Sequence, residues 1–229
     1  MSIRDQRILG ITLRKQHFSP RQLQVIFGTL LGDSSLNMRS NGSYRLKMSH
    51  SLKQLNYLEF KKKLLEPFII QLKATFDNSY LNNPDSFSSA PSYHYNSIVH
   101  QDFTDIAGLV YKNIDNHKRK YINMNLLNRI QPTAMLFWFL DDGCYHYNSK
   151  KHTHTMYLST YRYSLPEHRT LKKWFWHHWK IDSQISFDKT HNMFTLRFNK
   201  SNMIIFNNLF LKPFMYLVPS CMYYKFPKF

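Results

Sequence analysis

The chain has 229 residues, enough for one large domain or two small ones, and its 43% of hydrophobic residues predicts a folded core. Its 31 Lys and Arg residues against 14 Asp and Glu give a formal charge of +17, which favours a nucleic-acid partner, although basic charge can also serve solubility alone. Two cysteines exclude a disulfide framework, and no apolar run is long enough to span a membrane, so we expect no membrane partner. Residues 1–18 form a basic N-terminal arm without the apolar segment of a secretory signal, so we expect an intracellular protein that is not secreted.

The first half of the chain predicts a buried helix followed by strands and further helices. The helix begins at Ser19-Pro20, where serine is a good N-cap and proline suits the first helical position, and it ends at Gly32-Asp33. Asn41-Gly42 then predicts the turn of a hairpin, whose second strand alternates between polar and apolar side chains. Further along we expect helix 52–65, strands 70–76 and 93–99, and helix 103–111.

The second half repeats this order. A second buried helix begins at Pro132 and ends at Asp141-Asp142-Gly143. The elements expected after it are strands 144–147 and 155–159, helix 165–179, strands 184–188 and 194–199, and helix 202–211. The repeat predicts an α+β fold of two αββαββα halves, each with a four-stranded sheet that has one face under helices and one polar, basic face left open. That open face suits a DNA cradle, although a solvated outer face would show the same pattern. We place the halves at 19–112 and 132–229, joined by a polar, basic linker at 113–131.

Each of the two buried helices ends on aspartate, an unfavourable place for a carboxylate because the helix C-terminus already carries partial negative charge. If the helices pack side by side, Asp33 and Asp142 repel each other, and a divalent cation such as Mg²⁺ would relieve that repulsion. Lys120 and Lys225 follow the two aspartates at nearly the same distance along the chain. The repeat therefore indicates a paired metal site, although any one aspartate could also be a solvated helix end.

Residues 26–34, IFGTLLGDS, and residues 135–143, MLFWFLDDG, resemble two copies of the LAGLIDADG motif of homing endonucleases. Leu31 and Leu140 stand where the motif has its first acidic residue, and Phe137 replaces the helix-packing glycine of the second copy. The tail CMYYKFP, residues 221–227, is similar to the end of the intron-encoded, single-chain, two-motif branch that includes the mitochondrial omega-intron endonuclease. The resemblance extends over nearly the whole chain, from about residue 19 to residue 227.

The resemblance implies that two pseudo-symmetric halves pack through their LAGLIDADG helices and form a saddle of two antiparallel sheets for double-stranded DNA. It implies a monomeric, site-specific endonuclease that hydrolyses phosphodiesters in a long target and leaves staggered ends. Asp33 and Asp142 would be catalytic and would bind Mg²⁺ or Mn²⁺. The backbones of Gly32 and Asp141 would be further candidate ligands, and Lys120 and Lys225 would join the aspartates in catalysis. The residues expected to face DNA, each of which would also fit a solvated strand face, are Arg45, Lys47, Lys73, Tyr157, Gln184, Ser186 and Arg197.

Two rival functions stay open, an intron RNA maturase and a non-catalytic DNA-binding protein of the same fold. Both would use the same basic saddle, but neither needs both aspartates and both lysines. If the protein is intron-encoded, its expected place is an organelle, either a mitochondrion or a chloroplast. A structural zinc site at His152-Thr153-His154, or at Cys144 and His146, is disfavoured because such sites need four well-spaced ligands.

Overall fold

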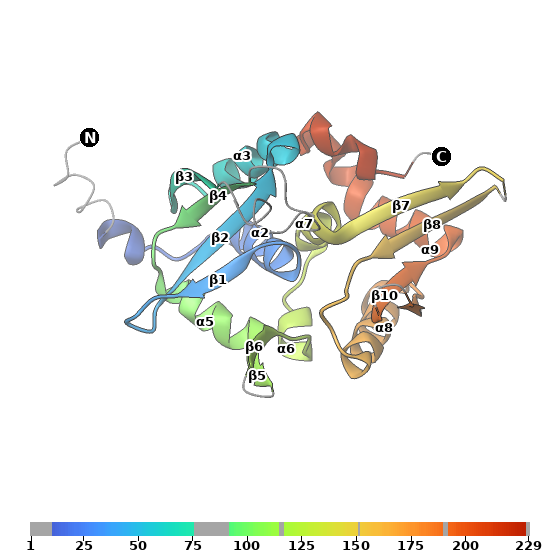
Figure 1. The fold of residues 1–229 in the computed structure, drawn as a ribbon, viewed down its shortest axis with the longest axis horizontal. Coiled ribbons are helices and arrows are strands. Elements are labelled where there is room, and N and C mark those ends of the chain that lie inside the picture. The colour runs from blue at the N-terminus through green and yellow to red at the C-terminus, as the bar shows by residue number, and fades with distance from the viewer. Residues whose placement is uncertain (1–10, 76–91, 115–116, 151, 190–191, 228–229) are drawn as a thin grey trace, which may run out of the picture.

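The fold is taken from a computed structural model, which describes residues 11–75, 92–114, 117–150, 152–189 and 192–227, with only the backbone described for residues 70–75. Figure 1 shows two halves on either side of a central pair of helices, α2 (Pro20–Leu31) and α7 (Pro132–Asp142). None of the helices in these ranges has the length and apolar character needed to cross a bilayer.

The central helices begin and pack as their sequences dictate. Helix α2 starts with a capping box, in which Ser19 and Gln22 each accept a hydrogen bond from the other's backbone N–H. Its buried residues run without interruption from Gln24 to Leu31, and those of α7 run from Ala134 to Asp141. A Cβ atom added at Gly28 would lie 2.2 Å from the backbone oxygen of Ala134, so this glycine permits the close approach of the two helices.

Each half contributes one antiparallel four-stranded sheet, and both sheets have the same strand order. The strands of the first sheet are β1 (Ser35–Met38), β2 (Tyr44–Ser51), β3 (Ile69–Thr75) and β4 (Ser92–Ser97), in the order β1-β2-β4-β3. Those of the second are β7 (Gly143–Asn148), β8 (Thr153–Leu158), β9 (Gln184–Asp188) and β10 (Met193–Phe198), in the order β7-β8-β10-β9. The matching orders confirm the expected fold of two related halves joined through α2 and α7.

Helices cover one face of each sheet and bury its apolar side chains. In the first half, a 3-10 turn (η1, Leu52–Gln54) leads into α3 (Leu55–Leu64), and α5 (Gln101–Val110) also packs on β2. In the second half, α8 (Leu165–Trp179) and α9 (Lys200–Phe206) pack on β10, and α9 continues into a π-helical turn, η2 (Asn207–Leu211). The chain ends in two 3-10 segments, η3 (Lys212–Leu217) and η4 (Ser220–Lys225), and η4 returns to contact α3 of the first half.

The connection between the halves is itself structured. Residues 113–131, expected as a linker, take part in a small hairpin of β5 (Tyr111–Ile114) and β6 (His117–Lys120) and contain a short helix, α6 (Met124–Leu127). The guanidinium of Arg119 donates to both carboxylate oxygens of Glu167 on α8, at 3.2 and 2.8 Å. The hairpin is therefore fastened to the second half, and it holds Lys120 at its end.

Candidate active site

The two motif aspartates lie where their helices end. Asp33 follows α2, and 43% of its side chain is exposed, whereas Asp142 is the last residue of α7. Burial raises the pKa of Asp142 to about 7, and the charge of Asp33 adds to that shift. Burial likewise raises the pKa of Asp33, and the charge of Asp141 contributes. The carboxylates thus repel each other in the way that their positions in the sequence predicted.

The two predicted lysines occupy equivalent places beside these aspartates. The Lys120 Nζ donates to the backbone oxygen of Gly32 at 2.9 Å, and the Lys225 Nζ donates to that of Asp141 at 2.7 Å. Each ammonium therefore binds the carbonyl of the residue that precedes a motif aspartate. Burial, with the nearby Arg162, lowers the pKa of Lys120 to about 7, and burial also lowers the pKa of Lys225.

A divalent cation fits the donors at these helix ends. The carboxylates of Asp33 and Asp142 and the carbonyls of Gly32 and Asp141 are hard oxygen ligands of the kind that Mg²⁺ and Mn²⁺ bind. Burial is the largest cause of the raised pKa of both aspartates and the charge of a neighbouring aspartate adds to each shift, so a bound cation would stabilise their ionised forms. These are the four residues predicted as metal ligands, and the structure brings their backbones to one end of the α2–α7 pair.

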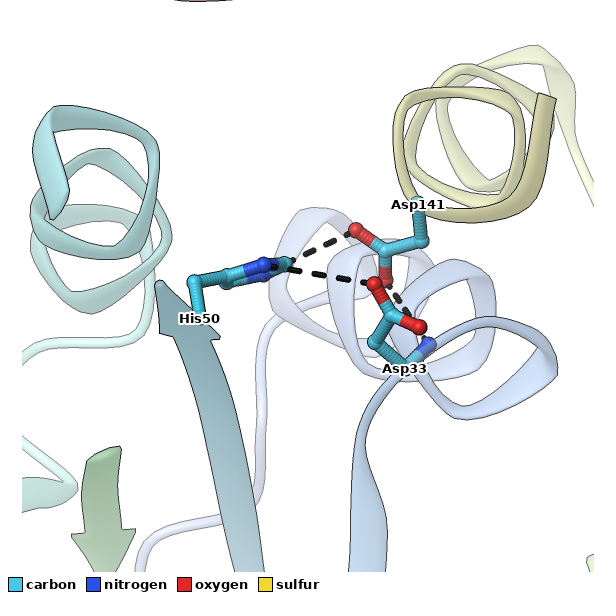
Figure 2. A group of neighbouring side chains, drawn as sticks. All are labelled: Asp33, His50 and Asp141. Atoms are coloured by element: carbon cyan, nitrogen blue, oxygen red, sulfur yellow. Dashed lines mark hydrogen bonds and ion pairs between the residues drawn. The ribbon is translucent and has the colours of Figure 1, made fainter. Parts of the chain in front are cut away.

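A buried network around the side chain of Asp141 was not predicted. This carboxylate is fully buried and crosses from the second half into the first (Figure 2). It accepts hydrogen bonds from the Lys61 Nζ at 2.6 and 2.9 Å and from the Tyr57 hydroxyl at 2.9 Å. It also accepts from the Thr29 hydroxyl at 3.1 Å and from the backbone N–H of Asp33 at 3.2 Å. Burial alone would raise the pKa of Asp141, but the attraction of Lys61 and the hydrogen bonds that the carboxylate accepts together hold the pKa below its usual value.

His50 links this network to Asp33. It lies near the end of β2, on the face covered by helices, with its Nε2 2.9 Å from the Lys61 Nζ and its Nδ1 3.9 Å from Asp33 Oδ2. Burial lowers the pKa of His50 to about 4, and the charge of Lys61 contributes, so the ring is neutral near pH 7. Ligand atoms of Asp33, His50 and Asp141 lie within 4.8 Å of one another, but both oxygens of Asp141 already accept from Lys61. The Asp141 carboxylate therefore serves as the ion-pair partner of Lys61 rather than as a metal ligand.

The residues expected to face DNA lie on the open faces of the sheets. In β2, Arg45 and Lys47 alternate with the buried Leu46 and Met48. The backbone of Lys73 pairs with His94, but the Lys73 side chain lies outside what the structure describes.

In the second sheet the register places three of the expected residues in one row. Tyr157 and Gln184 lie opposite Arg197 on its two sides, and the guanidinium of Arg197 lies 6.0 Å from the centre of the Tyr157 ring. Ser186 lies opposite Thr195 and lines a hollow of about 440 Å³ on this face. The alternation of residues along the strands thus places Tyr157, Gln184, Ser186 and Arg197 on one face of the second sheet.

Comparison with known proteins gives the family. Residues 23–206 match the LAGLIDADG DNA endonuclease family. The fold is similar to that of the homing endonuclease I-WcaI bound to its DNA recognition sequence, with a TM-score of 0.77, 20% identity, and coverage of 94% of this chain and 91% of that one. The chain is also 26% identical over 137 residues to the protein RecA of Mycolicibacterium flavescens, and 24% identical over 152 residues to that of Mycobacterium leprae (strain TN). These matches cover 58% and 65% of this chain but only 28% and 19% of the two relatives. Because the family match spans most of the chain, the protein belongs to the LAGLIDADG DNA endonuclease family.

Proposed function

We propose that the protein is a site-specific, double-strand DNA endonuclease of the single-chain, intron-encoded branch, acting as a monomer on a long target and leaving staggered ends. The observation that carries this proposal is the paired arrangement at the ends of α2 and α7. There, Asp33 and Asp142 each follow a carbonyl that accepts a hydrogen bond from a lysine, the buried Lys120 or the partly buried Lys225. Two such arrangements in one chain suit the cutting of two strands.

The residues at the helix ends would hold the metal and prepare the site. Bound to Asp33, Asp142 and the adjoining carbonyls, Mg²⁺ or Mn²⁺ would supply a polarised water as nucleophile and positive charge for the scissile phosphate. Lys120 and Lys225 orient the carbonyls to which they donate, and in their protonated forms they add positive charge next to the motif aspartates.

The open sheet faces and the net charge would bind the duplex. A formal charge of +17 favours phosphate contacts in general, whereas the row of Tyr157, Arg197 and Gln184 offers side chains that can reach base edges. A non-catalytic DNA-binding protein would gain nothing from carboxylates that repel phosphate without a metal. An intron RNA maturase would use the same basic surface, so intron RNA is a second candidate ligand.

Cleavage of a duplex library would test the proposal. The library should contain randomised sequences and candidate intron-insertion junctions, incubated with the protein and Mg²⁺. We expect specific staggered breaks that disappear with EDTA. Asp33→Asn and Asp142→Asn should each abolish double-strand cleavage but leave DNA binding measurable. The matched control is Asp105→Asn, an exposed aspartate on α5, which should cut as the wild type does.

Full cleavage by both single variants would reject the assignment of the site. Binding of intron RNA without breaks in any duplex would favour the maturase. Specific DNA binding without breaks, unchanged by Mg²⁺, would favour the non-catalytic DNA-binding protein.

A further inference from the structure

The two halves differ at the position just before each motif aspartate. Gly32 and Asp141 each precede a motif aspartate, but only Asp141 has a side chain. A Cβ atom added at Gly32 would lie 2.4 Å from the Asp141 Cβ and 2.6 Å from its Oδ2, so the Asp141 carboxylate fills the space on the glycine side. Of these two positions only Asp141 provides a carboxylate, and this carboxylate therefore packs against the first half.

That carboxylate fixes Lys61, and Lys61 fixes the tautomer of His50. The Lys61 Nζ lies 2.6 Å from Asp141 Oδ1, 2.8 Å from Thr29 Oγ1 and 2.9 Å from His50 Nε2. It also lies 2.9 Å from Asp141 Oδ2, and because an ammonium has no lone pair with which to accept, the His50 Nε2 must be the acceptor in its contact with Lys61. In a neutral ring the proton is then on Nδ1.

The Nδ1–H of His50 donates to Gln54 Oε1 at 3.2 Å, and the same edge of the ring lies beside the first motif aspartate. The Nδ1 atom is 3.9 Å from Asp33 Oδ2, too far for a hydrogen bond, and Figure 2 shows the ring directed toward Asp33. His50 and Asp33 both line an open hollow of about 320 Å³, whose other lining residues are Ser49, Ser51, Gln54 and Ser92. A ring held by Lys61 and Gln54 thus lies beside a half-exposed carboxylate, with room for water and a phosphate group.

The position equivalent to His50 in the second half holds no histidine, and the guanidinium near Asp142 belongs to Arg162. Continuing the register of β1 with β2, and of β7 with β8, makes Thr160 the equivalent of His50. Thr160 is fully buried, and its hydroxyl lies 2.7 Å from the Nε2 of His168 on α8. The Nδ1 of that histidine lies 2.9 Å from the backbone oxygen of Ser164, so both groups are turned into their own half.

We propose that His50 and Lys61 are positioning residues for the first motif aspartate only: Lys61 and Gln54 hold the ring of His50 at the wall of the hollow beside Asp33, and the ring limits the positions open to that carboxylate and to the water next to it. This inference rests on the proposed function. Its consequence is that the cut of one DNA strand depends on His50 and the cut of the other does not.

Strand-resolved kinetics would test this consequence. A target duplex labelled differently on its two strands is cut in single turnover with Mg²⁺. In His50→Ala, we expect one strand to be cut about tenfold more slowly or worse, because a misplaced reacting group is costly. The other strand should change by less than about twofold, so a nicked product accumulates. His50→Asn, whose amide can donate from nearly the same place, should recover part of the lost rate. Thr160→Val, the matched change in the second half, should not slow the strand that depends on His50.

The metal-free protein gives a second readout that does not depend on cleavage. ¹⁵N NMR of labelled histidine should show the Nδ1–H tautomer for His50 in the wild type and a mixture of tautomers in Lys61→Met. A wild-type Nε2–H tautomer would overturn the inference, as would equal slowing of both strands by His50→Ala with an unchanged melting temperature. If the wild type cut no duplex, the proposed function would be rejected and the strand-specific role with it. An active wild type with the Nδ1–H tautomer, together with slowing of one strand only in His50→Ala, would support both.

Discussion

Replacing Lys61 with methionine should destabilise the protein more than any exposed charge change. Methionine retains most of the apolar stem, so little cavity is created and the main loss is the ammonium. The Asp141 carboxylate, with 0% of its side chain exposed, would then be a buried charge without a cation. Breaking one partner out of a buried ion pair costs about 3–5 kcal/mol. For a chain of this length that corresponds to a fall in Tm of about 6–20 °C.

A double-mutant cycle separates the ion pair from simple loss of packing. Asp141→Asn alone leaves the ammonium buried without its carboxylate, so it should cost a similar amount. In the double variant Lys61→Met/Asp141→Asn neither charge of the pair remains, and an asparagine oxygen at the place of Oδ1 still accepts from Tyr57. We expect the double variant to be more stable than the sum of the single losses by at least about 2 kcal/mol.

The assay is chemical denaturation followed by circular dichroism and tryptophan fluorescence. The control is Lys62→Met on the same helix, where the lysine is partly exposed and pairs with the exposed Glu66 at 3.0 Å. Its loss should stay within about 1 kcal/mol. A cost below about 1 kcal/mol for Lys61→Met, or additive losses in the cycle, would refute the reasoning about a buried, charge-paired lysine.

Three further predictions follow from the packing, the electrostatics and the sheet faces. Gly28→Ala should cost about 1–3 kcal/mol in denaturation experiments, because its Cβ would meet a backbone oxygen, that of Ala134, at 2.2 Å; an unchanged stability would contradict the close packing. In metal-free protein, Asp142→Asn should be more stable than the wild type, and this difference in the free energy of unfolding should grow between about pH 4 and pH 7. Over that range the folded carboxyl, with its pKa raised to about 7, keeps a proton that the unfolded one has lost, so ionisation costs folding stability. Melting curves across this range would check it, and a gain that did not change with pH would argue against it. Lys47→Ala and Arg197→Ala should each reduce the salt dependence of DNA binding by about one counterion if the side chain meets phosphate, and unchanged slopes would remove that residue from the phosphate contacts.

The fold could be predicted because both halves of the sequence show the same order of helical and strand-like patterns of apolar residues. Both central helices have buried residues along nearly their whole length, and β2 alternates strictly between Leu46, Met48 and the polar residues beside them. The hairpin of β5 and β6 escaped prediction because its second strand, His-Lys-Arg-Lys, has no apolar residue. Its structure depends instead on a tertiary contact, the pairing of Arg119 with Glu167, which no local pattern reveals.

The residues of the candidate site could be predicted where each has a counterpart in the other half, and they were missed where it has none. Asp33, Asp142 and the two lysines were found because each has a counterpart in the other half. Lys61 stands first in a run of three lysines, which by itself indicates a solvated surface. Its spacing from Leu58, three residues earlier on the buried face of α3, was the available signal that it points inward.

The difference between Gly32 and Asp141 follows from the packing of α2 against α7. Where two related helices approach this closely, equivalent positions lie next to each other, and the gap holds only one side chain. Aspartate at both positions would clash and would bury a second charge. Glycine at both would leave the Lys61 ammonium without a carboxylate to pair with. Glycine on one helix and aspartate on the other satisfies both packing and charge. Two identical chains could not adopt this arrangement, because each would need both residues at one position. The single chain is therefore what allows its two halves to hold Asp33 and Asp142 in different surroundings.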